Sequence, residues 1–298
     1  MSDIALIGLD WGSTNLRAFA FDADGGVISR RHSDAGALTL SGPPAFDAAL
    51  VALVGDWAEA NTIAPMISCG MVGARSGWRE ARYVETGADA TALAAGIVRV
   101  DTSLGRSLAI IPGMRSDEPD VMRGEETQLV GADVGDGIIV LPGTHSKWVR
   151  MSDGCVESFA TFFTGEMNAL IREHSSVGKA LTSKPDVHDR ASFDMGVAYA
   201  RAGAASWLHD LFVLRASVVT GQKTEAEVST VLAGWLLGCE YAAALAMYPQ
   251  TRGIVTIASD ALAPWYQSAA RAFGIGCDAL NSEAATTNGL WQIARLLR

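Results

Sequence analysis

The chain has 298 residues, of which 49% are hydrophobic and 19% are charged. This balance excludes a disordered, collagen-like or coiled-coil protein, and the length predicts about two domains at roughly 150 residues each. The formal net charge of −10 argues against a nucleic-acid binder or an anionic-membrane binder, although a small anionic ligand needs only local donors. Four scattered cysteines and the lack of a signal-peptide pattern predict a cytoplasmic protein.

The first predicted elements are three short strands joined by tight turns. An apolar run at Ile4–Leu9 leads into a turn at Asp10–Asn15, and Leu16–Phe21 is the second strand. Asp24–Gly26 then turns the chain into a third strand at Val27–Arg31.

The same succession of strand, glycine-hydroxyl turn, strand, Asp-Gly turn and strand recurs over residues 138–159. Two such meanders more than a hundred residues apart favour a duplicated α/β architecture, with a chance likeness as the alternative.

Between the two meanders, hydrophobic spacing predicts two helices and two strands, at Ala45–Ala60, Pro65–Cys69, Ala88–Val98 and Leu108–Ile111. The Pro-containing stretch Arg115–Asp120 is the predicted crossing between domains, so we expect domains at 1–115 and 116–298.

Beyond the second meander, residues 164–248 are mainly helical by period, apart from a polar loop at Thr182–Asp189. A strand at Gly253–Ala258 and helices at Pro264–Phe273 and Asn288–Leu297 complete the chain.

The stretch Val231–Tyr248 is the most membrane-like part of the chain, but it carries Glu240 in its middle. A carboxylate at a bilayer centre costs about 2.5–3.5 kcal/mol on insertion scales, so we interpret this stretch as a buried helix and expect no membrane partner.

Two turns, one in each meander, carry the donors that a phosphate group needs. Glycine lets the backbone approach a phosphate closely, while backbone N–H groups and hydroxyls donate to its oxygens. The candidate phosphate-binding residues are Gly12, Ser13, Thr14, Asn15, Gly143, Thr144, His145, Ser146 and Lys147. Asp10, at the mouth of the first turn, is the candidate ligand of Mg²⁺ through water. Ordinary hairpin turns are the alternative.

Glu125 and Glu126 are the candidate catalytic residues. One carboxylate could accept the proton of a substrate hydroxyl as it attacks a γ-phosphate. Acids in the first turn of a helix are also favoured by the helix dipole whatever their function.

A glycine-rich loop that follows the strand Pro65–Cys69 is the candidate sugar-side loop. Its arginines could bind a carboxylate, and its aromatic rings could stack on a sugar, unless Trp78 is instead part of the core. The candidate substrate-binding residues are Gly70, Met71, Arg75, Trp78 and Tyr83.

Five segments resemble the 2-keto-3-deoxygalactonokinase family and follow one another over nearly the whole chain. The two most specific strings are Met-Arg-Gly-Glu-Glu-Thr-Gln and Pro-Gly-Thr-His-Ser-Lys-Trp. The five segments are Leu9–Ala18, Cys69–Gly73 followed by Gly77–Trp78, Asp120–Gln128, Leu141–Trp148, and Thr164–Glu166 followed by His174–Ser175.

The resemblance implies two ribonuclease-H-like domains of the actin-like ATPase type around an interdomain ATP cleft. Residues 1–115 would carry the sugar-side loop, while 116–298 would carry a helical insertion and the nucleotide-side elements. It also implies that ATP with Mg²⁺ phosphorylates 2-keto-3-deoxygalactonate at its terminal hydroxyl, giving the 6-phosphate. Glu125 is the favoured base, and Ala258 and Ser259 would lie beside the adenine.

Arg75 or Lys147 would neutralise the sugar acid or the phosphates. Three alternatives remain: a kinase of the same fold for another sugar or sugar acid, a non-catalytic actin-like ATP-binding module, and a phosphohydrolase. The expected partners are therefore small molecules, and a homodimer is left open.

Overall fold

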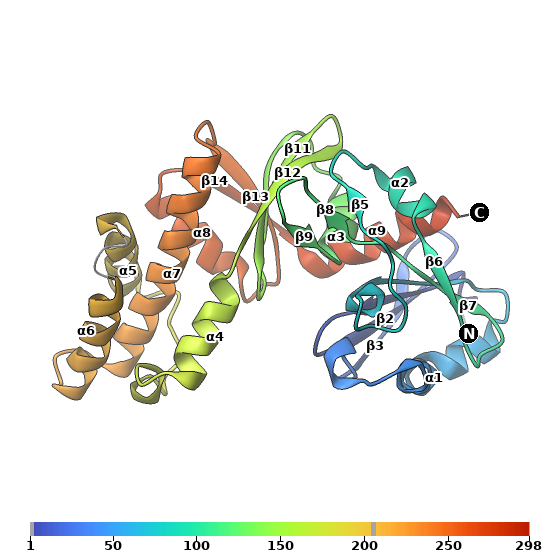
Figure 1. Ribbon diagram of the computed structural model, residues 1–298, viewed down its shortest axis with the longest axis horizontal. Helices are drawn as coiled ribbons and strands as arrows, with labels where there is room; N and C mark the ends of the chain where they lie inside the picture. The colour runs from blue at the N-terminus through green and yellow to red at the C-terminus, as the bar shows by residue number, and fades with distance from the viewer. Residues whose placement is uncertain (1–2, 204–206, 298) are drawn as a thin grey trace. The chain divides into compact units, whose positions relative to one another are not determined.

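The computed structural model describes residues 3–203 and 207–297, which form two compact units, each built around its own main β-sheet (Figure 1). One unit contains the chain up to Asp136, together with Met151–Ser158 and the chain from Asn281 onward. The other contains Gly137–Arg150 and Phe159–Leu280. Each unit therefore draws on separate stretches of chain and does not follow the predicted boundary at 115/116.

The first unit contains a six-stranded sheet with helices on both faces. Across the sheet, the strands are β3 (Val27–Ser33), β2 (Leu16–Phe21), β1 (Leu6–Trp11), β4 (Met66–Gly70), β7 (Ser107–Ile110) and β6 (Val98–Asp101). β1 runs antiparallel to β2 and parallel to β4. Helix α1 (Pro43–Ala60) packs Phe46 and Leu50 against one face, and α9 (Ser282–Arg295) packs Leu290 and Ile293 against the other.

β1 extends two residues beyond the predicted apolar run, so Asp10 and Trp11 are strand residues and do not belong to the turn. The reason is the indole ring of Trp11, which is fully buried and contacts the rings of Phe46 and Trp78 at centroid distances of 5.4 and 6.1 Å. This aromatic cluster fixes the end of β1 and thereby the position of Asp10.

Helix α3 (Glu125–Ala132) belongs to the first unit because it crosses α9 at very close range. A Cβ added to Gly131 would lie 1.9 Å from the carbonyl oxygen of Ala285, and one added to Gly289 would lie 1.9 Å from that of Thr127. Only glycines allow this crossing.

The predicted domain crossing at Arg115–Asp120 is instead part of a small sheet in the first unit. The sheet consists of β5 (Val84–Glu85), β8 (Met114–Arg115) and β9 (Val121–Met122), and β8 pairs antiparallel with β9. Pro119 therefore lies in the connection of a hairpin. The shorter helices of this unit are η1 (Ala37–Thr39), η2 (Met71–Gly73) and α2 (Ala90–Ala95).

The second unit repeats the strand arrangement of the first, which confirms the predicted duplication. Its five strands, in order across the sheet, are β12 (Cys155–Phe162), β11 (Ser146–Ser152), β10 (Gly137–Leu141), β13 (Gly253–Ala258) and β14 (Gly276–Asn281). β10 pairs parallel with β13, as β1 does with β4. β14 escaped prediction because it is an exposed strand at the sheet edge, without apolar alternation.

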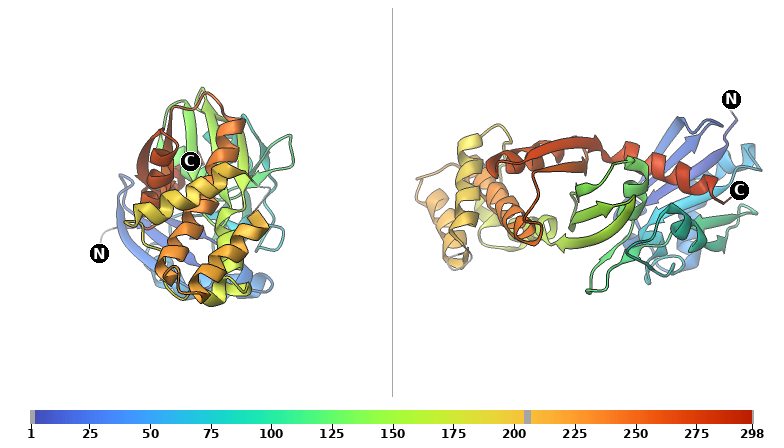
Figure 2. Two further views of the ribbon diagram at one scale, coloured as in Figure 1. Left: turned by 90° about the vertical axis from the view of Figure 1, so that its left-hand side faces the viewer. Right: turned by 90° about the horizontal axis from the view of Figure 1, so that it is seen from above.

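Four helices of the second unit gather beyond the sheet, as Figure 2 shows. They are α4 (Thr164–His174), α5 (Arg190–Ala202), α6 (Trp207–Val219) and α7 (Glu225–Met247), with η3 (Gly178–Ala180) beside α4. α7 is the one helix in the described ranges that is long and apolar enough to cross a membrane, and 56% of that window is buried in the protein. Together with the buried side chain of Glu240, this burial supports the interpretation of α7 as a core helix.

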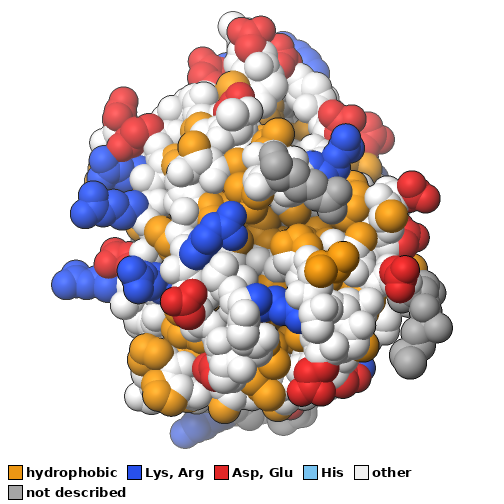
Figure 3. Space-filling view, turned by 90° about the vertical axis from the view of Figure 1, so that its right-hand side faces the viewer, with side chains coloured by type: hydrophobic (Ala, Val, Ile, Leu, Met, Phe, Trp, Pro, Cys, Tyr) orange, Lys and Arg blue, Asp and Glu red, His pale blue; other side chains and the backbone are white. Residues whose placement is uncertain are grey.

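Helix α8 (Ala263–Ala272) follows β13, and α9 begins at Ser282, six residues before the predicted start. The side chain of Asn281 sets that start, because its Oδ1 accepts hydrogen bonds from the backbone N–H groups of Glu283 and Ala284. On the face drawn in Figure 3, both acidic and basic side chains surround a more hydrophobic middle, so the net negative charge does not give this face a single sign.

Candidate functional site

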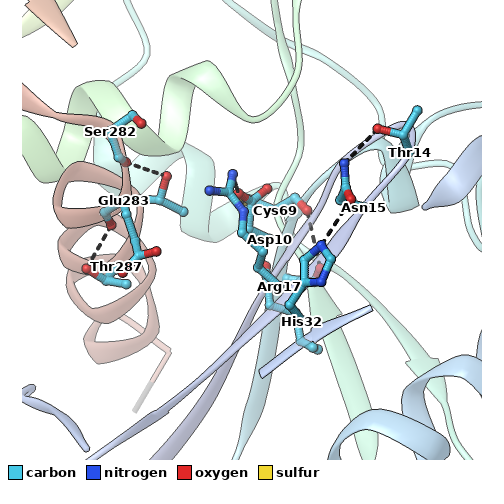
Figure 4. A network of polar contacts seen from close by, with 12 residues as sticks. Asp10, Thr14, Asn15, Arg17, His32, Cys69, Ser282, Glu283 and Thr287 are labelled. Atoms are coloured by element: carbon cyan, nitrogen blue, oxygen red, sulfur yellow. Dashed lines mark hydrogen bonds and ion pairs between the residues drawn. The ribbon is translucent and has the colours of Figure 1, made fainter. Parts of the chain in front are cut away.

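Four polar side chains form a row across one face of the first sheet, where β1 and β4 end. Asp10 lies opposite Arg17 on β2 and beside Cys69 on β4, and Arg17 in turn lies opposite His32 on β3. Residues directly opposite each other on neighbouring strands point to the same face. Figure 4 shows Asp10, Arg17 and Cys69 together, with His32 nearby.

Asp10 is buried and forms an ion pair with Arg17. Burial raises the pKa of Asp10 above its usual value, and the positive charge and hydrogen bond of Arg17 oppose this rise. The negative charges of Glu125 and Glu283 raise the same pKa further.

The first predicted phosphate turn is held by its own backbone. The N–H of Gly12 donates to the carbonyl of Asn15 at 2.9 Å, so Gly12 shapes the turn and does not offer its amide to a ligand. The amide of Asn15 donates to the hydroxyl oxygen of Thr14 at 2.8 Å, and its Oδ1 lies 3.0 Å from Nε2 of His32. Ser13 is half-buried and Thr14 is exposed at the end of the turn.

Glu125 and Glu126 begin helix α3 and turn their carboxylates back onto the preceding backbone. The N–H of Arg123 donates to Oε2 of Glu125 at 2.9 Å, and the N–H of Gly124 donates to Oε2 of Glu126 at 2.7 Å. These bonds satisfy amides at the start of the helix, where the dipole also favours negative charge.

The two glutamates differ in exposure. Glu125 is half-buried, whereas only 1% of Glu126 is exposed, and its Oε1 accepts a hydrogen bond from the hydroxyl of Thr127 at 3.0 Å. Burial, with a further contribution from the charge of Glu125, raises the pKa of Glu126 to about 7. Glu126 also lines a small pocket with Leu93 and Met151.

The predicted sugar-side loop lies against the start of α3. Gly70 has a φ of 89°, and a Cβ added there would lie 2.6 Å from the carbonyl oxygen of Trp11. A Cβ added to Gly124 would meet the Cα of Gly70 at 3.5 Å. The structure thus brings together the Gly70–Gly73 loop, the end of β1 and the start of α3, which are far apart in the sequence.

Within this loop, the stacking role of Trp78 is wrong, because its ring is only 6% exposed and packs on Trp11 and Phe46 in the core. Tyr83 is exposed, but its ring is stacked by the guanidinium of Arg123 at 4.3 Å. Arg75 is exposed and Met71 is half-buried.

Arg123 was not among the predicted site residues. Its Nη2 donates to the carbonyl of Ala81 at 2.9 Å, which ties the loop to α3. The signal for it was present in the sequence, since Arg123 lies two residues before Glu125.

The second predicted phosphate turn lies between β10 and β11 in the second unit. Gly143, Thr144 and His145 are exposed, whereas Ser146 and Lys147 are buried. The side chains of the last two are therefore part of the interior: the Ser146 hydroxyl donates to Glu240 at 2.7 Å, and Nζ of Lys147 donates to the carbonyl of His145 at 3.1 Å.

The start of α4 closes over this turn. A Cβ added to Gly165 would lie 2.2 Å from the carbonyl oxygen of Gly143, and the N–H of Glu166 donates to the carbonyl of Thr144 at 2.9 Å. The ring of His145 stacks on Phe163 at 5.3 Å, while its Nε2 lies 2.5 Å from a carboxylate oxygen of Glu166. The Thr164–Glu166 segment of the resemblance thus lies directly beside the Gly143–His145 turn.

A cavity of about 250 Å³ opens beside the same turn, within the second unit. Its walls are mostly apolar, with two polar side chains near the turn, and include Gly143, Thr164, Asn168, Leu236, Leu262 and Trp265. Such a cavity suits a flat aromatic group attached to a phosphate chain.

Ala258 and Ser259 do not line this cavity. Ala258 is buried at the end of β13, and the carbonyl of Ser259 accepts hydrogen bonds from the N–H groups of Leu262 and Ala263 at the start of α8. The sequence could not have found Trp265 or Leu236, because their apolar side chains carry no motif.

Residues 10–293 match the model of the 2-keto-3-deoxy-galactonokinase family. The chain is 36% identical over 296 residues to the 2-dehydro-3-deoxygalactonokinase of Escherichia coli (strain K12), covering 97% of each protein. A crystal structure of a Sinorhizobium meliloti protein assigned as a 2-dehydro-3-deoxygalactonokinase superposes with a TM-score of 0.89 at 34% identity, covering 97% of this chain and 96% of that one.

A more distant structure shares the fold alone. The activator of the 2-hydroxyisocaproyl-CoA dehydratase from Clostridium difficile, solved with bound ADPNP, superposes with a TM-score of 0.52 at 11% identity, covering 98% of this chain and 95% of that one. Together with the repeated strand order, these likenesses confirm the predicted α/β fold of the actin-like ATPase and sugar-kinase type.

Proposed function

The chain belongs to the 2-keto-3-deoxy-galactonokinase family and is a carbohydrate kinase, and we propose that it carries out the family's reaction with the residues described above. The reaction is the transfer of the γ-phosphate of ATP to the terminal hydroxyl of 2-keto-3-deoxygalactonate, giving the 6-phosphate. The observation that carries this assignment is the pair of carboxylates at the start of α3, close to the buried Asp10.

We assign the role of general base to Glu125. Its side chain is half-buried at the start of α3, and its negative charge raises the pKa of Asp10. From there it can accept the proton of the attacking hydroxyl. Glu126 is buried and accepts a hydrogen bond from the N–H of Gly124, which suits a residue that fixes the start of α3.

Asp10 and Glu125 also fit a site for Mg²⁺, which binds oxygen ligands and commonly uses one or two carboxylates together with substrate phosphates. No group of three or more metal-ligating side chains occurs among residues 3–203 and 207–297, so the phosphates of the nucleotide would supply further ligands. When bound, the ion would neutralise the charge of the transferring phosphate. Arg17 holds the Asp10 carboxylate in place for this role.

The nucleotide would bind to the second unit. The exposed backbone of Gly143–His145 offers donors for phosphate oxygens, and the apolar cavity beside it accommodates the base, with Trp265 as a stacking partner. Arg75, exposed on the sugar-side loop, would bind the carboxylate of the sugar acid. The proposal places the enzyme in the cytoplasm, in agreement with its four unpaired cysteines.

The test is ADP release with 2-keto-3-deoxygalactonate and its C4 epimer assayed side by side, for the wild type and for Glu125→Gln and Glu126→Gln. We expect activity with the galactonate derivative and at least about a hundredfold loss of kcat in Glu125→Gln, because general-base catalysis commonly contributes 10² to 10⁴. Glu59→Gln, on the exposed side of α1, is the matched control and should behave as the wild type. Full kcat in Glu125→Gln would remove Glu125 from the base role, and a preference for the epimer would change the substrate.

A further inference from the structure

Glu240 is a buried acid that the proposed reaction does not use. It belongs to α7, a helix rich in apolar residues, and only 2% of it is exposed. Burying a carboxylate is costly unless hydrogen-bond donors surround it, so its retention at this position calls for a compensating role.

The partners of the Glu240 carboxylate come from three other elements. At Oε1 it accepts hydrogen bonds from the Ser146 hydroxyl at 2.7 Å and from the Trp148 indole N–H at 2.9 Å. At Oε2 the Tyr266 hydroxyl lies at 3.2 Å, and that hydroxyl is also 3.0 Å from Oγ of Ser146. The side chain of Thr164 is a further hydrogen-bond partner.

These partners adjoin both the turn and the cavity that form the proposed nucleotide site. Ser146 is the first residue of β11 and directly follows the exposed Gly143–His145 turn. Tyr266 of α8 and Thr164 of α4 both line the apolar cavity beside that turn. A single carboxylate therefore connects the end of the phosphate turn to the walls of the cavity.

We propose that Glu240 is a positioning residue for ATP, which sets the Gly143–His145 turn at a fixed distance from the base-binding cavity. Burial raises the pKa of Glu240, and the hydrogen bonds from Thr164, Trp148, Ser146 and Tyr266 oppose this rise. An ionised carboxylate suits the task because it only accepts hydrogen bonds, and these partners are all neutral donors. A glutamine of the same shape would point an N–H₂ group at one of these donors, leaving it unpaired in the interior. This inference rests on the proposed location of the nucleotide in the second unit.

The experiment compares Glu240→Gln with the wild type in steady-state kinetics and in calorimetric titration with ADP. We expect the loss of one buried hydrogen bond to a charged group to raise KM for ATP, and Kd for ADP, by about tenfold. KM for the sugar acid should stay within twofold, and so should kcat at saturating ATP. Ser229→Ala is the control, because it removes a partly buried hydrogen bond, to the carbonyl of Ser183, from the same helix, and neither residue lines the cavity or belongs to the turn. It should lower the melting temperature without changing KM for ATP.

Tyr266→Phe provides a second variant in case Glu240→Gln does not fold. It removes only the hydroxyl at Oε2 and should raise KM for ATP by about threefold, with a less than additive effect in the double variant. The deciding variant is Glu240→Gln, or Tyr266→Phe if Glu240→Gln does not fold. If that variant binds ADP with the Kd of the wild type, the positioning role is refuted while the proposed function stands. If the wild type binds no ADP, the nucleotide site itself is refuted and the inference falls with it.

Discussion

Replacing Glu126 with glutamine should change how the stability of the protein depends on pH. Burial holds the pKa of Glu126 at about 7, against 4.5 for an ordinary glutamate, so the folded protein retains a proton that the unfolded chain has lost. Below pH 4.5 the carboxyl is protonated in both states. As the pH rises from 4.5 to 7, the free energy of unfolding falls, and above 7 the loss is complete.

The size of this effect follows from the shift in the pKa. About 2.5 pH units, at 1.36 kcal/mol for each, correspond to about 3 kcal/mol of stability that the wild type loses between acid and neutral pH. Glutamine has the same shape, does not titrate, and can still accept the hydrogen bond from the N–H of Gly124. Relative to the wild type, Glu126→Gln should therefore gain about 3 kcal/mol between pH 4.5 and pH 8.

The measurement is urea unfolding, followed by tryptophan fluorescence, at closely spaced pH values from 4.5 to 8 for both proteins. The difference between the two unfolding free energies isolates Glu126 from all other titrating groups. Glu125→Gln is an informative companion, since removing the neighbouring charge should shift the pH range of the loss toward acid. If the difference in unfolding free energy between Glu126→Gln and the wild type stays constant from pH 4.5 to 8, Glu126 titrates alike in the folded and unfolded states, and this reasoning is refuted.

Two further predictions concern packing in the first unit. Gly131→Ala should destabilise the protein by about 2 kcal/mol or more in urea unfolding, because its Cβ would overlap the backbone of α9. Gly135→Ala is the control, since Gly135 has open space around it, and it should change the free energy of unfolding by less than about 1 kcal/mol. Equal effects of the two substitutions would argue against the close crossing. Trp78→Phe should lower the melting temperature but leave KM for the sugar acid within about twofold, since the ring fills the core. A large rise in that KM without loss of stability would restore Trp78 to the binding site.

The fold was largely predictable because its strongest signal is repeated. The two meanders share an order of strands and turns that can be seen in the sequence, and both sheets continue with a strand parallel to the first strand of the meander. The domain boundary was not predictable in the same way. It depends on the close crossing of α3 with α9, which brings together glycines 158 positions apart in the chain.

The site was predictable only to the level of segments. The start of α3 lies against Gly70, and the strand that ends at Gly70 pairs with the strand of Asp10, but the sequence does not show which side chain of a motif faces outward. Ser146 has the hydroxyl of a phosphate donor, yet the strand begins at this residue and turns the hydroxyl inward to Glu240.

The same limit explains why two adjacent glutamates can have different roles. Consecutive residues in a helix point about 100° apart, so Glu125 and Glu126 lie in different surroundings. The environment of each side chain decides its role: Glu125 remains half-buried and interacts with the charge of Asp10, while Glu126 is enclosed and keeps its proton up to about neutral pH. We therefore expect substitution by glutamine to separate the two residues: loss of turnover at Glu125, and a change in the pH dependence of stability at Glu126.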